Sequence, residues 1–82
     1  MTKAQEIYQN MKKRGRIYKA YGKWGISYAS LYVSIKEAGY TADETIWTII
    51  ENMKAKGYIR ESKDTWGRER RHQKYIITKW EN

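Results

Sequence analysis

Hydrophobic residues in the first two-thirds of the chain recur at helical spacing. Three sets place apolar residues at positions i, i+3, i+4 and i+7, which form one face of an α-helix. The sets are Ala4, Ile7, Tyr8 and Met11; Tyr28, Leu31, Tyr32 and Ile35; and Ile46, Ile49, Ile50 and Met53. The pattern predicts helices near residues 3–14, 28–38 and 42–56.

Start and stop signals bracket the three predicted helices. Thr2 and Gln5 have the spacing of a capping box, and the same spacing recurs at Thr41 and Glu44. Ser27 is a predicted N-cap of the second helix. A glycine follows each predicted helix where left-handed backbone commonly ends a helix: Gly15, Gly39 and Gly57.

The last third of the chain changes to short runs of β-branched and aromatic residues. These runs, at residues 58–62 and 74–78, are typical of strands. The polar segment 63–73 between them predicts a β-hairpin with a long basic tip, spanning residues 58–79.

Residues 16–25 permit two interpretations. Their aromatic residues recur at i, i+3 and i+6: Tyr18, Tyr21 and Trp24. This spacing is compatible with a continuation of the first helix. Gly22 and Gly25 equally favour a structured loop.

Composition limits the class of protein. Eighty-two residues allow one small domain, and an aromatic content of 15% argues against disorder. No apolar run approaches the ~20 residues of a membrane span, and no signal peptide opens the chain. The absence of Cys excludes disulfides and thiolate metal sites, so we expect an intracellular, cytoplasmic protein.

The residues needed for catalysis are scarce. His72 is the only His, and no nucleophile, phosphate-loop or zinc-protease motif occurs. We therefore expect no enzymatic activity, no metal and no cofactor. We expect five tyrosines to lie at core edges with their hydroxyls near polar partners: Tyr28, Tyr32, Tyr40, Tyr58 and Tyr75.

The order of the predicted elements resembles the winged helix-turn-helix family of DNA-binding domains. The resemblance rests on motifs between residues 26 and 79: Ile26-Ser27-x-x-x-Leu31, Thr45-Ile46-x-x-x-Ile50-x-x-Met53, Met53-x-x-x-Gly57-Tyr58-Ile59 and Tyr75-Ile76-Ile77-Thr78. It implies a single α+β domain over residues 1–82, with three helices followed by a two-stranded wing. It also implies duplex DNA binding, with the third helix in the major groove and the wing on the backbone or minor groove.

The charge is unevenly distributed. The net charge of +8 divides into +6 in residues 1–26, −3 in residues 27–52 and +5 in residues 53–82. The positive charge toward both ends of the chain predicts a salt-sensitive nucleic-acid footprint. The outer face of the third predicted helix includes Glu44 and Glu51, which is a departure from a typical recognition helix.

Three groups of residues are predicted to contact nucleic acid. The wing contributes Arg68, Arg70, Arg71 and Lys74. The N-terminal region contributes Lys12, Lys13, Arg14, Arg16, Lys19 and Lys23. The third helix contributes side chains that can contact bases: Thr45, Thr48 and Asn52.

These features favour a small DNA-binding protein, a transcriptional regulator or an accessory factor of a mobile element or virus. One alternative is an RNA or single-strand binder that stacks bases on Tyr18, Tyr21 and Trp24. Another is a protein-interaction module that uses the acidic third helix and Trp47. Trp47 and Trp80 lie off the predicted core, where a homodimer interface can form.

Overall fold

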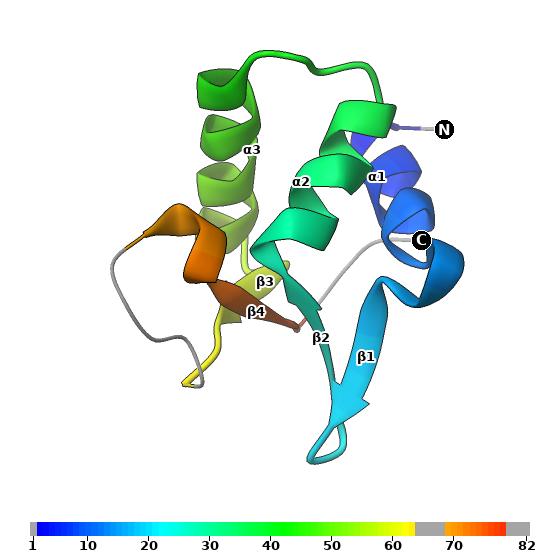
Figure 1. Ribbon diagram of the computed structural model, residues 1–82, viewed down its shortest axis with the longest axis vertical. Helices are drawn as coiled ribbons and strands as arrows, with labels where there is room; N and C mark the ends of the chain where they lie inside the picture. The colour runs from blue at the N-terminus through cyan, green and yellow to red at the C-terminus, as the bar shows by residue number, and fades with distance from the viewer. Residues whose placement is uncertain (1, 64–68, 79–82) are drawn as a thin grey trace.

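The computed structural model describes residues 2–63 and 69–78, which form three α-helices and a four-stranded antiparallel sheet (Figure 1). The helices are α1 (Lys3–Met11), α2 (Tyr28–Glu37) and α3 (Asp43–Ala55). The strands are β1 (Ile17–Ala20), β2 (Lys23–Ser27), β3 (Ile59–Glu61) and β4 (Lys74–Ile77). Two 3₁₀ turns, η1 (Lys13–Gly15) and η2 (Arg70–His72), complete the order, and the predicted α+β class is confirmed.

The three predicted helices are confirmed, with shorter ends and one different cap. Thr2 and Gln5 form the predicted capping box, and the Ser27 hydroxyl oxygen accepts the N–H of Ser30. The capping box predicted at Thr41 is wrong, because Ala42 is the N-cap of α3 and makes no side-chain cap bond. Acidic residues in the first turn of α3 instead complement the helix dipole.

Both interpretations of residues 16–25 are wrong. This segment forms the antiparallel hairpin of β1 and β2, joined by Tyr21 and Gly22. Both residues have positive φ angles, 53° and 76°, as in a two-residue turn that matches the twist of a hairpin. Because β2 also pairs with β4, ladder hydrogen bonds on both of its sides outweigh the local helical spacing.

The sheet has four strands instead of the two predicted, in the order β1-β2-β4-β3. The strands expected near 58–62 and 74–78 are present as β3 and β4, and they pair antiparallel. The segment between them contains η2, while residues 64–68 lie outside the described part of the chain.

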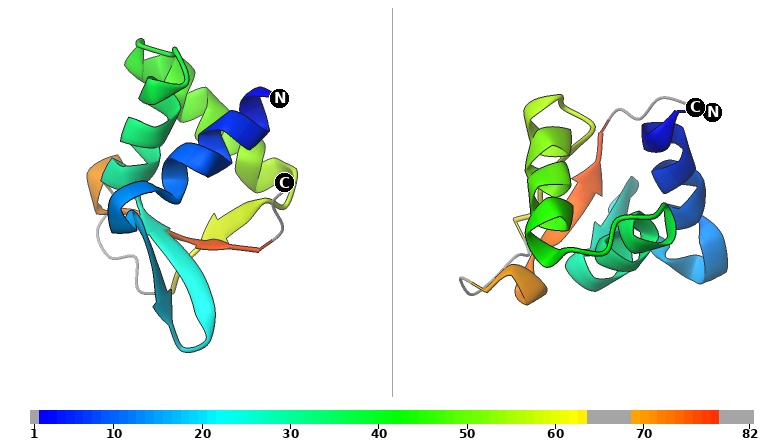
Figure 2. Two further views of the ribbon diagram at one scale, coloured as in Figure 1. Left: turned by 90° about the vertical axis from the view of Figure 1, so that its right-hand side faces the viewer. Right: turned by 90° about the horizontal axis from the view of Figure 1, so that it is seen from above.

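The three helices cover one face of the sheet (Figures 1 and 2). Their apolar stripes meet side chains from β2, β3 and β4 in one core: Ile7, Met11, Ile26, Leu31, Ile35, Ala38, Ile46, Ile50, Met53, Ile59 and Tyr75. Because all three helices lie on this side, they leave the opposite face of the sheet uncovered.

None of the helices in the described ranges is long and apolar enough to cross a membrane.

Tyr75 is deeper than expected. Tyr28, Tyr32, Tyr40 and Tyr58 are half-buried, but Tyr75 is fully buried because β4 is a central strand of the sheet. Among the described residues its hydroxyl has no hydrogen-bond partner. Burial raises the pKa of the Tyr75 phenol, and the charges of Glu61 and Glu51 raise it further.

We predict that Tyr75→Phe leaves the free energy of unfolding unchanged near pH 7 or raises it by up to about 1 kcal/mol, because the variant removes an unpaired buried hydroxyl. The Tyr75 pKa is higher in the folded than in the unfolded protein, so the folded state favours the neutral phenol. This contribution to the free energy of unfolding is therefore fully present below about pH 10 and is lost as the pH rises further. Urea unfolding at about pH 7 and about pH 11 should therefore show a smaller alkaline loss in the variant. A loss above about 1 kcal/mol near pH 7 would show that the hydroxyl has a partner.

Candidate functional site

The uncovered face of the sheet has one aligned row of residues, one from each strand. Tyr18 pairs with Gly25 and Gly25 with Ile76. Ile76 in turn pairs with Arg60 on β3. Successive side chains of a strand point to opposite faces, and the neighbouring Ile26 is in the core. The row therefore faces away from the helices.

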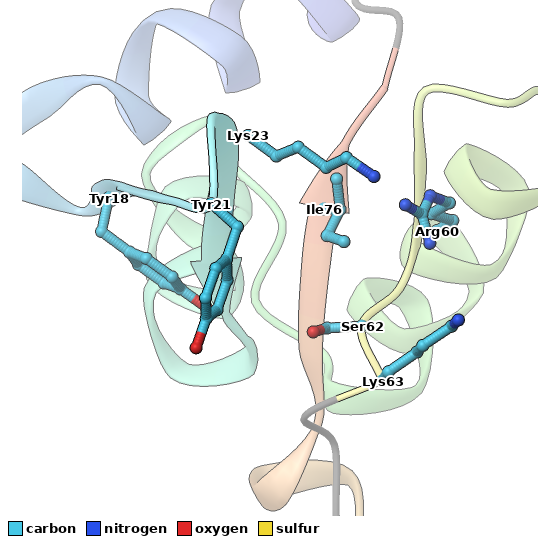
Figure 3. A pocket seen from close by; sticks show the side chains of 8 residues that line it. Tyr18, Tyr21, Lys23, Arg60, Ser62, Lys63 and Ile76 are labelled. Atoms are coloured by element: carbon cyan, nitrogen blue, oxygen red, sulfur yellow. The ribbon is translucent and has the colours of Figure 1, made fainter.

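This row is the floor of a groove of about 480 Å³, which we call the sheet groove. Its lining combines two tyrosines with three cations: Tyr18, Tyr21, Lys23, Gly25, Arg60, Ser62, Lys63 and Ile76. In Figure 3 the two tyrosines lie on one side, Arg60 and Lys63 on the other, and Ile76 between them. No carboxylate occurs among the described residues that line the groove.

Gly25 allows the Tyr18 ring to lie against the sheet. A β-carbon at Gly25 would lie 3.0 Å from two atoms of the Tyr18 ring and 3.1 Å from its hydroxyl oxygen. The ring thus occupies the position above the strand that a side chain would fill. It buries Gly25, while 40% of Tyr18 itself stays exposed.

Tyr21 is placed at a cost to the fold. Its φ of 53° lies in the left-handed region, where a residue other than glycine loses roughly 1–2 kcal/mol. Asn, Asp or Gly is the usual first residue of such a turn. The side chain is 96% exposed, so packing within the described residues does not offset this cost. A strained, exposed aromatic residue is more typical of a binding site than of a structural position.

The one acidic side chain on the strands of the described chain is directed away from the sheet groove. The four strands contain four basic residues and one acidic residue, Glu61. Glu61 Oε1 lies 3.1 Å from Lys54 Nζ on α3, so Glu61 is directed toward the helical side. Burial disfavours the Lys54 ammonium, but hydrogen bonds to Glu51 and Glu61 outweigh it and raise the Lys54 pKa. The charge of Lys54 is thus balanced locally.

Arg16, one of the predicted nucleic-acid contacts, is held inside the fold. Its two terminal guanidinium nitrogens donate to the two carboxylate oxygens of Glu37, at 2.6 and 2.9 Å, and one of them also donates to the Asn10 backbone carbonyl at 2.9 Å. Only 14% of the side chain is exposed. The hydrogen bond to Glu37 is the main cause of its raised pKa. Arg16 therefore joins the end of α1 to the end of α2.

The other predicted N-terminal cations lie at the end of α1, in η1 and on the β1–β2 hairpin. Lys12 and Lys13 are exposed beyond the end of α1, with Lys12 Nζ 4.6 Å from the Tyr8 ring centroid. Arg14 lies in η1. Lys19 Nζ lies 5.8 Å from the Trp24 ring centroid on the hairpin. Of the members of this group whose side chains the structure describes, Lys23 alone lines the sheet groove.

The described wing residues lie in η2 and β4. Arg71 pairs with Glu69, Arg70 lies in η2 and Lys74 is half-buried in β4. Gln73, which follows η2, accepts the Tyr28 N–H at 2.9 Å, so this segment is attached to the start of α2. Arg68 lies outside the described residues.

The predicted contacts on α3 share a surface with an acidic residue. Thr45, Thr48 and Asn52 are exposed, as is Glu44. The Thr48 hydroxyl donates to the Glu44 carbonyl within the helix. This face therefore combines hydroxyl and amide groups with the Glu44 carboxylate.

Trp47 packs against the core instead of lying off it. The side chain is half-buried, with its ring centroid 6.2 Å from that of Tyr28 and 5.8 Å from Lys54 Nζ. The packing partner of Trp47 is Tyr28, at the start of α2. A helical wheel of α3 alone does not show a partner on another helix. Trp80 lies outside the described residues, and the homodimer interface stays a prediction.

Arg60 and Lys63 are the two groove cations that the sequence pattern did not single out. Arg60 alternates with Ile59 and Glu61, so a period of two would have placed it on the face opposite the core.

The sequence signal for the β1–β2 hairpin was a residue-glycine pair, Tyr21-Gly22, between two short strand-forming runs. It was weak because Tyr is unusual at that turn position.

In comparisons with family models, curated proteins and solved structures, no match to this chain was found. Within the described residues, no group of three or more His, Cys, Asp or Glu side chains is placed to hold a metal ion.

We predict opposite effects of Gly25→Ala in two backgrounds. Without the Tyr18 ring, in Tyr18→Ala, the change should raise the free energy of unfolding by about 0.5–1 kcal/mol, because alanine is preferred to glycine in a strand. With the ring present, the new methyl must displace it, so the gain should vanish or become a loss. A double-mutant cycle from urea unfolding measures the difference, and equal effects in both backgrounds would contradict the contact.

We predict that Arg16→Ala lowers the free energy of unfolding by about 1.5–3 kcal/mol, because it removes charge-assisted hydrogen bonds and leaves their acceptors unpaired. Arg16→Lys should recover only part of this loss, since an ammonium cannot bind both Glu37 oxygens as the planar guanidinium does. Lys13→Ala, at an exposed position nearby, is the control and should change stability by less than about 0.5 kcal/mol. Equal stability of all three variants would show that the ion pair does not stabilise the fold.

Proposed function

We propose that the protein binds nucleic acid on the sheet groove. The observation that supports this most directly is a groove with three cations, two exposed tyrosines and no carboxylate among its described lining. Lys and Arg side chains on one surface neutralise phosphates and release counterions. The aromatic rings can contact nucleobases, which other polyanions lack.

The order of elements gives further support. Three helices followed by the antiparallel pair of β3 and β4 agree with the winged-helix resemblance, to which the β1–β2 hairpin is an addition. The resemblance implies that the third helix enters the major groove of DNA. Glu44 on the exposed face of α3, and the pairing of Lys54 with Glu51, argue against α3 as the main phosphate contact. We therefore assign binding to the sheet groove.

Duplex DNA binding through the wing and the N-terminal region stays a prediction, as does the role of a regulator or mobile-element factor. The protein-interaction alternative has less support, because the Trp47 side chain is already packed on Tyr28.

The salt dependence of binding tests the proposal. The double variant Lys23→Ala/Arg60→Ala should weaken binding of a fluorescein-labelled oligonucleotide of mixed sequence in an NaCl series. The slope of log K against log salt should become shallower by roughly 0.7–0.9 per lost phosphate contact. Fluorescence anisotropy with the full chain measures both quantities.

The matched control is Lys36→Ala/Lys56→Ala, which removes the same charge from exposed positions on α2 and at the end of α3. This control should keep the wild-type slope. If the two double variants changed the affinity and the salt slope equally, binding would depend on net charge alone. That result would contradict the assignment to the groove. Absence of binding by the wild-type protein at low salt would contradict nucleic-acid binding altogether.

A further inference from the structure

The two tyrosines of the sheet groove differ from the other tyrosines of the protein. Tyr8, Tyr28, Tyr32, Tyr40 and Tyr58 pack against the core. Tyr18 and Tyr21 are instead 40% and 96% exposed and lie near one another on the same side of the groove (Figure 3). The sheet therefore presents aromatic surface to solvent from one edge hairpin.

Both positions are shaped around the rings. Because Gly25 has no side chain, the Tyr18 ring lies directly against strand β2 at that position. At Tyr21 the backbone adopts a left-handed conformation that Asn or Gly would adopt more easily. Tyr is favoured in strands, so Tyr18 suits its place on β1, but Tyr21 is not the residue that turn stability alone would favour. A ligand for the ring accounts for Tyr21.

The cations lie across the groove from the rings. Arg60 and Lys63 are on the opposite side, and Lys23 extends over the centre from β2 (Figure 3). A ligand that spans the groove thus meets aromatic surface on one side and positive charge on the other. A single nucleic-acid strand has this arrangement, because its bases and its phosphates project to different sides of the chain.

A duplex fits this arrangement less well. Its bases are stacked on each other inside the helix and cannot stack on protein rings unless they are unpaired. A surface that only held a duplex backbone would need cations but not two exposed tyrosines. From this contrast we infer that the sheet groove binds single-stranded nucleic acid, with bases stacked on Tyr18 and Tyr21 and phosphates held by Lys23, Arg60 and Lys63. The inference rests on the proposed function and specifies its ligand.

Tyr21→Asn is the sharpest test, because it separates binding from stability. Asn tolerates the left-handed backbone, so urea unfolding should show equal or greater stability. Loss of the ring should weaken binding of a short fluorescein-labelled single strand by about tenfold. Tyr21→Phe is the control, since it keeps the ring and should keep the affinity. A structural role for Tyr21 would instead make stability and binding fall together.

The same strand, free and annealed to its complement, tests the ligand class at matched salt. The wild-type protein should bind the free strand more tightly, and Tyr21→Asn should leave the duplex affinity unchanged. A strand carrying 2-aminopurine should change its fluorescence on binding the wild-type protein but not on binding Tyr18→Ala/Tyr21→Asn.

Two results would overturn the inference. One is tighter binding of the duplex, and the other is a single-strand affinity that Tyr21→Asn does not change. If Lys23→Ala/Arg60→Ala still weakens binding in either case, the proposed function stands and only the single-strand assignment fails. If the wild-type protein binds neither form at low salt, both fail.

Discussion

The pairing of β2 with β4 is the contact on which the rest of the structure depends. It joins a strand near the start of the chain to one near its end, with Ile26 opposite Tyr75 and Gly25 opposite Ile76. The first pair is in the core under the helices, and the second is on the opposite face. Because side chains alternate along a strand, one register determines both faces. A slip by one residue would expose Tyr75 and bury the floor of the sheet groove.

The same pairing explains the uneven distribution of charge around the sheet. The core face has to accept the apolar stripes of three helices, so its strands contribute Ile26, Ile59 and Tyr75. The opposite face has no such requirement and can hold Arg60. Glu61, one residue further along β3, points back toward Lys54. Alternation along one short strand thus separates a cation from a carboxylate, and the cation remains available to a ligand.

Much of the helical structure was predictable because its signals are local. The apolar stripes and the caps at Thr2 and Ser27 involve residues within two turns of one another. The prediction was wrong at the start of α3, where Thr41 has the spacing of a cap but Ala42 occupies that position. It was also wrong for the β1–β2 hairpin, whose turn residue Tyr21 is unfavourable for the turn that it forms.

For the candidate site, the sequence and the tertiary structure contributed different information. The excess of positive charge and the aromatic residues at 18, 21 and 24 were apparent from composition and spacing, and they made nucleic acid a candidate ligand, but the sequence did not show that these rings are exposed. Which cations meet which rings was decided only by the tertiary structure. Arg16 was removed from the candidates by its pairing with Glu37, and Arg60 was added by its place opposite Ile76. The sequence by itself determined the three helices and the net charge, because both follow from residue type and local spacing. The sheet groove depends on contacts between residues 18, 25, 60 and 76, which only strand register brings together.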